Sequence, residues 1–222
     1  MIVVIGGQKG GTGKSTLAEN LTVILAHAGQ KTLLVDTDVQ ASASKWSDTR
    51  SQFPALPSFT TVQKTGKIAP TLEKMRADYD QIVVDAGGRD SIELRSALLV
   101  ADRLVVPVRP SQKDLWTVDA VAEVVEAASA LNERLRAALL LTMVSTNPAV
   151  RELQSARELL AELPGFGVCQ AVIHDRKAYR DVVFLGKGVI EHHDPKAAAE
   201  IQALATEIYP DVVRVHSATA AA

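Results

Sequence analysis

Short apolar runs alternate with longer segments of helical period along most of the 222-residue chain. The runs are rich in valine, isoleucine and leucine, as is typical of strands that are covered on both faces. A helical segment between two such runs suits a crossover that returns the chain to a parallel strand. The pattern therefore predicts a doubly wound α/β fold, with a mostly parallel sheet and helices on both faces.

The apolar runs and the helical segments give explicit boundaries for this fold. We expect strands at Ile2–Ile5, Thr32–Asp36, Gln81–Asp85, Leu104–Val108, Ala138–Val144 and Val168–Ile173. We expect helices at Ser15–Ala28, Lys67–Ala77, Ile92–Val100, Leu115–Leu131, Pro148–Leu163 and Lys196–Ile208. The stretch from Phe53 to Thr61 contains two prolines and predicts a surface loop that enters a short extra strand. Ligands of such sheets bind at the carboxyl ends of the strands.

The composition fits one globular domain, which we place at residues 1–210, followed by a poorly ordered tail at 211–222. With 47% hydrophobic residues the chain can build a sizeable core. The net charge of −2 gives no overall reason to expect binding to nucleic acid or an anionic membrane, so such binding needs a local patch. The single cysteine, Cys169, excludes a disulfide or a cysteine-ligated metal site within one chain and is expected to be a buried strand thiol.

The first apolar run is too short for the core of a signal peptide and has no basic leader. It continues directly into glycines. We therefore expect a cytoplasmic protein.

A glycine-rich loop follows the first predicted strand and precedes a predicted helix. Its glycines let backbone N–H groups turn inward around a phosphate, and the helix directs its positive end at the same anion. Lys14 would reach the outer phosphates, and the Ser15 hydroxyl would ligate Mg²⁺. The predicted phosphate-binding residues are Lys9, Gly10, Gly11, Thr12, Gly13, Lys14, Ser15 and Thr16.

The loop departs from the ordinary phosphate-loop sequence, because Gln8 stands where that sequence has its first glycine. Its form, K-G-G-x-G-K-[ST], resembles the deviant Walker A motif of the ParA/MinD family of ATPases. The resemblance implies ATP as the nucleotide and an ATP-sandwich homodimer. In that dimer Lys9 reaches the phosphates of the partner's nucleotide, so Lys9 and Lys14 are both expected to be catalytic.

Two carboxylates, Asp36 and Asp38, follow the second predicted strand. Beside a phosphate they need a metal to neutralise them, and a carboxylate can also orient an attacking water. The segment resembles the family's D-x-D-P-Q motif, with Val39 in place of the proline. The resemblance implies that Asp36 belongs to the metal shell and that Asp38 positions the hydrolytic water.

Asp85 ends a third apolar run and fits a Walker B aspartate that holds Mg²⁺ through water. The following Ala86–Asp90 has glycines where many family members have proline, which predicts a mobile loop. Arg89 in this loop is either a charge stabiliser for hydrolysis or the partner of a nearby carboxylate. After the fourth run, the sequence from 109 to 116 resembles the P-S-x-x-D loop of ParA proteins, in which Asp114 would cap a helix.

The resemblance also implies DNA binding without sequence preference when ATP is bound. The cations expected to contact DNA are Arg176, Lys177, Arg180 and Lys187, with Arg214 as a weaker fifth. A solvated surface is the alternative for this modest patch. The chain has no basic amphipathic helix at its end, so no membrane partner is expected.

Together these features predict a nucleoid-associated ATPase that partitions a plasmid, chromosome or protein cargo through a ParB-like adaptor that stimulates hydrolysis. Two other classes stay open. A metabolic ligase of the dethiobiotin-synthetase type would use the same phosphate site to activate a small carboxylate. A regulatory module would bind nucleotide without cleaving it.

Overall fold

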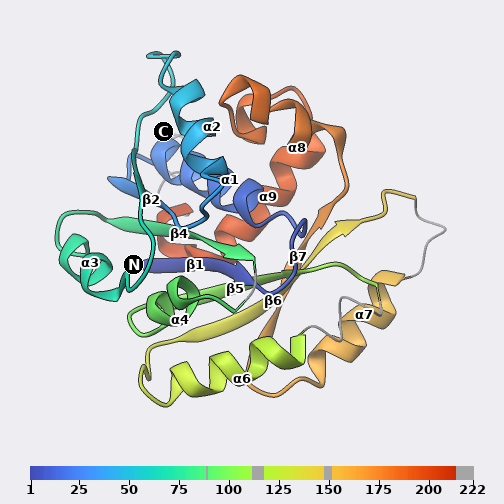
Figure 1. Cartoon of the computed structure of the whole chain (residues 1–222). Helices are drawn as coiled ribbons and strands as arrows, with labels where there is room; N and C mark the ends of the chain where they lie inside the picture. The colour runs from blue at the N-terminus through green and yellow to red at the C-terminus, as the bar shows by residue number, and fades with distance from the viewer. Residues whose placement is uncertain (89, 112–117, 148–151, 214–222) are drawn as a thin grey trace.

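The computed structural model describes residues 1–88, 90–111, 118–147 and 152–213. Seven parallel strands form one sheet in the order β3-β2-β4-β1-β5-β6-β7 (Figure 1). The strands are β1 Ile2–Gly7, β2 Thr32–Asp36, β3 Thr60–Gln63, β4 Gln81–Gly88, β5 Arg103–Val108, β6 Arg136–Val144 and β7 Phe166–His174. The predicted doubly wound α/β fold is confirmed, and the strand order reverses beside β1.

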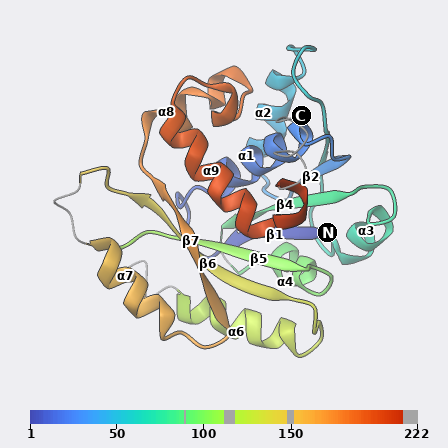
Figure 2. The same ribbon diagram turned by 180° about the vertical axis from the view of Figure 1, so that it is seen from behind.

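Helices cover both faces of the sheet (Figures 1 and 2). One face carries α1, α2, α8 and α9, and the other carries α3, α4, α6 and α7. The α-helices are α1 Lys14–His27, α2 Ser42–Arg50, α3 Ala69–Met75, α4 Ile92–Leu98, α6 Val118–Ser129, α7 Glu152–Ala161, α8 Lys177–Asp181 and α9 Pro195–Ile208, and two 3₁₀ turns are η1 Val183–Leu185 and η2 Val189–Glu191.

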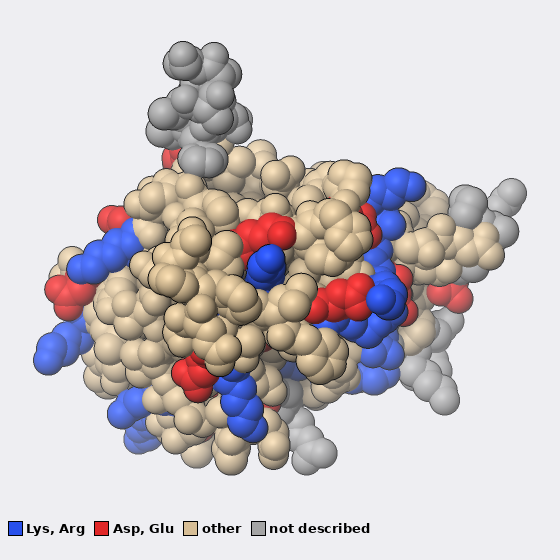
Figure 3. Space-filling view, turned by 90° about the horizontal axis from the view of Figure 1, so that it is seen from above, with Lys and Arg blue, Asp and Glu red and all other residues tan. Residues whose placement is uncertain are grey.

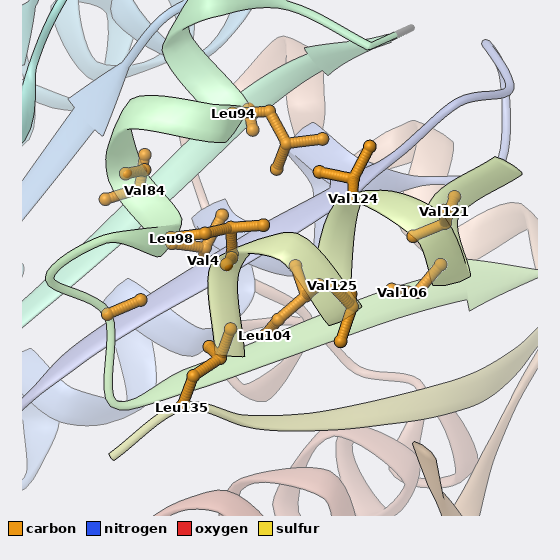
Figure 4. Packing of buried hydrophobic residues seen from close by; sticks show 14 of the residues in the cluster. Val4, Val84, Leu94, Leu98, Leu104, Val106, Val121, Val124, Val125 and Leu135 are labelled. Carbon is orange, nitrogen blue, oxygen red and sulfur yellow. The ribbon is translucent and has the colours of Figure 1, made fainter. Parts of the chain in front are cut away.

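Alternating residues of each strand feed two separate cores. On β1, Val4 faces the core under α4 and α6, whereas Val3 and Ile5 face the core under α1 and α9. Figure 4 shows the first of these cores, in which valines and leucines of α4 and α6 meet those of β1, β4 and β5. Because β1 is buried on both faces, the loop that follows it is fixed at the centre of the sheet edge.

All six expected strands are present, and β3 is the extra strand expected after the proline-containing loop. Two helices, α2 and α8, were missed. In α2 only Ala43, Trp46 and Arg50 are buried, and α8 spans five residues, so neither has an apolar stripe long enough to show helical period. The predicted starts at Leu115 and Pro148 lie outside the described residues.

Cys169 lies buried in β7, as expected, and burial raises the pKa of its thiol to about 12. Val212 and Val213 pack partly buried against the core of α1 and α9, so the described fold continues past residue 210. No helix in the described part of the chain is long and apolar enough to cross a membrane.

Strand register brings three loops together at one edge of the sheet. Asp36 of β2 pairs in register with Asp85 of β4, and Asp85 pairs with Ile5 of β1. The phosphate loop and the two aspartate-bearing loops therefore leave the sheet from neighbouring strands at the same level.

A buried ion pair fastens the segment before α9 to the end of α2. Arg50 donates two hydrogen bonds of 2.8 Å to the Glu191 carboxylate, and His27 at the end of α1 lies 2.7 Å from the same group. Gly186 has φ +60°, and a Cβ there would lie 2.4 Å from the Arg50 backbone nitrogen, so only glycine permits this close approach. Burial raises the pKa of Glu191, but the hydrogen bonds from Arg50 and His27 dominate and lower it to about 2.

We predict that Glu191→Gln lowers the free energy of unfolding by about 3 kcal/mol at pH 7, because it leaves the Arg50 charge buried and unpaired. The folded-state pKa of Glu191 lies below the ordinary value of 4.5, so this contribution is present above that pH and is lost as the pH falls toward 2. Urea denaturation at pH 7 and at pH 3.5 measures both effects. Asp181→Asn, which breaks the exposed pair with Lys177, is the control and should cost less than about 1 kcal/mol. Equal losses in the two variants would contradict the prediction.

Candidate nucleotide-binding site

The glycine-rich loop joins β1 to α1 and has the backbone of a phosphate cradle. Gly11 and Gly13 have φ of +73° and +91°, in the left-handed region that only glycine adopts without strain. Gly13 is the N-cap of α1, so the helix begins at Lys14 and its positive end faces the cradle. The structure thus provides the strand, loop and helix context that the sequence predicted.

Lys14 is buried, and its Nζ donates a hydrogen bond of 2.7 Å to the carbonyl oxygen of Lys9. Burial lowers the pKa of the Lys14 ammonium, and the carboxylates of Asp85 and Asp38 offset part of this effect. The two lysines of the motif therefore lie on one loop, with the buried charge of Lys14 electrostatically coupled to both aspartate-bearing loops.

Ser15 and Asp85 lie together, as a shared metal site requires. The Ser15 hydroxyl hydrogen-bonds to the Asp85 carboxylate, which is 1% exposed. The second carboxylate oxygen, Oδ2, is buried with no hydrogen-bond partner among the described residues. The pKa of Asp85 is raised to about 7, mainly by burial and also by the nearby Asp36. The hydrogen bond from Ser15 opposes part of this rise.

A divalent cation suits this pair, because it would satisfy the orphaned oxygen and offset the buried charge. No group of three His, Cys, Asp or Glu side chains in the described ranges is close enough to hold a metal by itself. The protein residues thus fit an ion that is shared with phosphate and water, as is usual for Mg²⁺.

Asp36 is fully buried and organises the loop that follows it. Its Oδ1 accepts a hydrogen bond from the Asp38 backbone N–H at 3.0 Å, and its Oδ2 accepts from the backbone and hydroxyl of Ser44 in α2. Both of its oxygens are therefore occupied by the loop and the start of α2. Its role in the metal shell stays a prediction.

Asp38 projects from this loop toward the next one. A Cβ built on Gly87 would lie 3.6 Å from Asp38 Oδ2, so the carboxylate lies against the backbone after β4. Thr37 joins the two loops: its N–H and hydroxyl both donate to the Asp85 carbonyl at 3.0 Å, and its hydroxyl accepts from the Gly87 N–H at 3.3 Å. The predicted residues Asp36, Asp38 and Asp85 are thus brought to one place.

A cavity of about 110 Å³ adjoins the phosphate loop on the side of β6 and β7. Met143, a non-glycine residue with φ +53°, lines it, and the Thr142 hydroxyl donates to the Thr12 carbonyl at 3.0 Å. The left-handed conformation of Met143 costs about 1–2 kcal/mol, a kind of strain that clusters at functional sites. Other lining residues include Leu17, Ile173, Arg176, Tyr179 and Arg180.

The predicted DNA contacts lie on or near α8, and most of them are engaged with carboxylates. Arg176 forms an ion pair with Glu200, Lys177 with Asp181 and Arg180 with Asp175. Lys187 makes no ion pair with any other described residue. Figure 3, seen from the side of α2 and α8, shows basic and acidic side chains lying side by side. The DNA contacts therefore stay predictions, and Arg214 lies outside the described residues.

Sequence reasoning missed three site residues. Thr37 stands between the two aspartates of its motif, and that position was the available signal. Arg109, at the end of β5, donates to the Gly11 carbonyl, and Glu19 is buried on α1 near Asp85 and Asp36. For Glu19, the signal was a charged residue in the helix that directly follows the phosphate loop. Arg89 and Asp114 lie outside the described residues.

Comparison with known proteins fits this geometry. The model of the CobQ/CobB/MinD/ParA nucleotide binding domain matches residues 3–189. The chain belongs to this family. A "Maintenance of carboxysome distribution protein A" of Halothiobacillus neapolitanus is 30% identical to this ParA/MinD-family chain over 94% of the chain and 96% of the relative. The "Chromosome-partitioning ATPase Soj" of Thermus thermophilus is 28% identical over 86% and 87%, respectively.

Solved structures show the same fold at lower identity. The MinD cell division protein of Aquifex aeolicus superimposes with a TM-score of 0.76 at 18% identity, over 95% of this chain and 97% of that one. Cyanothece McdA without nucleotide gives a TM-score of 0.73 at 15% identity, over 91% and 97%. These structures confirm the fold, and the family model over residues 3–189 confirms the predicted membership of the ParA/MinD family.

We predict that Gly13→Ala lowers the free energy of unfolding by about 1–2 kcal/mol, because alanine must then adopt φ near +91°. Gly10→Ala is the matched control, since Gly10 has no positive φ and a Cβ there meets no atom of the described residues within 4 Å. Urea denaturation without nucleotide measures both variants. A Gly10→Ala loss as large as that of Gly13→Ala would show that the left-handed backbone is not the cause.

Proposed function

We propose that the chain is a ParA-like ATPase that forms an ATP-dependent sandwich homodimer, binds DNA without sequence preference and positions a cargo. The observation that carries the proposal is the deviant phosphate loop, with Lys9 and Lys14 on one loop beside the coupled carboxylates of Asp38 and Asp85. Relatives that match over nearly the whole chain are named for carboxysome distribution and for chromosome partition.

Different residues of the chain bind different parts of the nucleotide. The loop backbone and the positive end of α1 bind the phosphates, and Lys14 leaves the Lys9 carbonyl to contact the outer ones. Lys9 reaches across the dimer to the partner's nucleotide. Mg²⁺, when bound to Ser15 and held through water by Asp85 and Asp36, neutralises the phosphate charge.

Asp38 orients the attacking water, and its loop reports the state of the nucleotide. Thr37 ties this loop to the loop after β4, so loss of the γ-phosphate at one loop displaces both. The cavity beside Thr142 and Met143 takes the adenine and ribose, because it continues from the phosphate loop and is mostly apolar.

Two kinds of cargo fit this cycle. A DNA cargo would be carried by a ParB-like adaptor that stimulates hydrolysis. A protein cargo, such as a microcompartment, would use the same cycle, and the relative named for carboxysome distribution supports it as the relative named for chromosome partition supports a DNA cargo. In both cases the ATP-bound dimer holds the nucleoid, and hydrolysis releases it.

Asp38→Ala should retain ATP binding and lower the rate of hydrolysis by about 100-fold, because the variant binds phosphate normally but leaves the water unpositioned. Phosphate release and binding of a fluorescent ATP analogue separate the two effects. The control Asp48→Ala removes an exposed carboxylate of α2 and should change neither. Unchanged hydrolysis in Asp38→Ala would show that another group positions the water, and nucleotide binding without hydrolysis in the wild type would assign the regulatory class.

Random-sequence duplex DNA should bind with ATP, and not with ADP or without nucleotide, and the affinity should fall steeply with salt. Lys9→Ala should abolish binding by preventing the dimer. Lys187→Glu should weaken it more than Lys177→Glu, because Lys187 has no carboxylate partner among the described residues whereas Lys177 pairs with Asp181.

The control is Arg134→Glu, which makes the same charge change at an exposed loop before β6. Nucleotide binding without DNA binding under every one of these conditions would overturn the nucleoid role. Turnover that depends on a small carboxylate substrate would then point to the ligase class.

A further inference from the structure

Glu19 is a buried carboxylate in the middle of α1, where the phosphate loop does not require one. The residue is 4% exposed, and no described residue donates a hydrogen bond to its side chain, although its oxygens keep slight contact with solvent. A carboxylate without a partner inside a protein costs several kcal/mol when it is charged. In the first helix after the phosphate loop, Glu19 is therefore either protonated or paired with a cation that the described residues do not supply.

The helix places Glu19 on the same face as Ser15. Residues four apart on an α-helix lie one above the other, about 5–6 Å between Cβ atoms. Ser15 hydrogen-bonds to Asp85, so this face of α1 looks onto the ends of β2 and β4. Glu19 thus lies one turn behind the residue that would ligate the metal.

The electrostatic surroundings of Glu19 are negative. Burial raises the pKa of Glu19 well above its usual value, and Asp85 and then Asp36 raise it further. Lys14 interacts electrostatically with Asp85 and Asp38. No cation among the described residues lowers the pKa of Glu19. The carboxyl groups of Glu19, Asp85 and Asp36 are therefore electrostatically coupled, and the Lys14 ammonium is coupled to Asp85.

A direct bond from Glu19 to the ion does not fit the geometry. No three carboxylates of the described residues converge at ligand distance, and a helical turn separates Glu19 from Ser15. Mg²⁺ binds oxygen at about 2.1 Å and keeps several of its waters. The Glu19 carboxylate can reach such a water, because one water and one hydrogen bond bridge the extra distance.

We propose that Glu19 is a positioning residue of the magnesium site, whose carboxylate accepts a hydrogen bond from a water bound to the ion at Ser15 and Asp85. This inference rests on the proposed nucleotide site and adds a residue to it. The bound ion supplies the missing counter-charge, and Glu19 in return fixes the orientation of the ion's water shell.

Titration of the full chain with Mg²⁺ at a fixed concentration of fluorescent ATP analogue tests the proposal. Glu19→Gln keeps the size of the side chain and removes its charge. It should raise the Mg²⁺ concentration for half-saturation about tenfold or more, as expected for a group that orients metal ligands. In EDTA, the affinity for the analogue should change by less than about twofold. Glu126→Gln, an exposed carboxylate of α6, is the control and should behave as wild type.

Thermal unfolding in EDTA separates a structural role from a metal role. A buried carboxyl with only a structural role would shift the melting temperature of Glu19→Gln and leave the Mg²⁺ half-saturation unchanged, which would overturn the inference. Glu19→Asp keeps the charge and shortens the side chain. Its Mg²⁺ concentration for half-saturation should lie between those of wild type and Glu19→Gln. It replaces Glu19→Gln in the test if that variant does not fold. A wild-type half-saturation in Glu19→Asp would then overturn the inference.

The assay contains no DNA or cargo, so its outcome is separate from the positioning role. If wild type binds the analogue without any effect of Mg²⁺, both the nucleotide chemistry and the inference fail. If wild type depends on Mg²⁺ and Glu19→Gln shows the same dependence, the inference alone fails.

Discussion

The register between β2 and β4 is the constraint on which the site depends. It pairs Asp36 with Asp85 at the end of two buried strands, and Thr37 then joins the loops that follow. Because the side-chain period of a strand is two, a slip of either strand by one residue would turn its carboxylate to the opposite face of the sheet. The packing of two apolar cores thus fixes the position of charges that have almost no contact with solvent.

Burying these charges lowers the stability of the chain when no ligand is bound. Asp85 retains an oxygen without a partner in the described ranges, and Lys14 donates to the carbonyl of Lys9 in its own loop. Buried polar groups of this kind favour a state in which phosphate and a cation complete the site. Ligand binding then stabilises the fold by relieving charge as well as by adding contacts.

The sequence was sufficient where a residue's environment follows from its neighbours in the chain. Buried strands such as β1 and β4 were predicted from apolar runs, and Gly13 and Lys14 from a loop whose conformation is local. The start of α2 could not be predicted, because Ser44 is held by Asp36 through a tertiary contact in a segment with little apolar surface. The contacts of Glu19 and Thr37 depend on β2 and β4 being neighbours in the sheet. The contact of Arg109 depends on β5 lying beside the phosphate loop. These contacts could not be predicted from the sequence.

The anchoring of α2 has a mechanical consequence. Its first turn is held by Asp36, and its last residue, Arg50, is bonded to Glu191 and to the Gly186 carbonyl. A nine-residue helix is about 13 Å long and behaves as a rod at this length. One end of α2 thus lies at the edge of the sheet that carries the phosphate loop, and the other lies against the segment that carries Gly186 and Lys187. The helix therefore connects Asp36 at the sheet edge to the segment with Lys187 through hydrogen bonds at both of its ends.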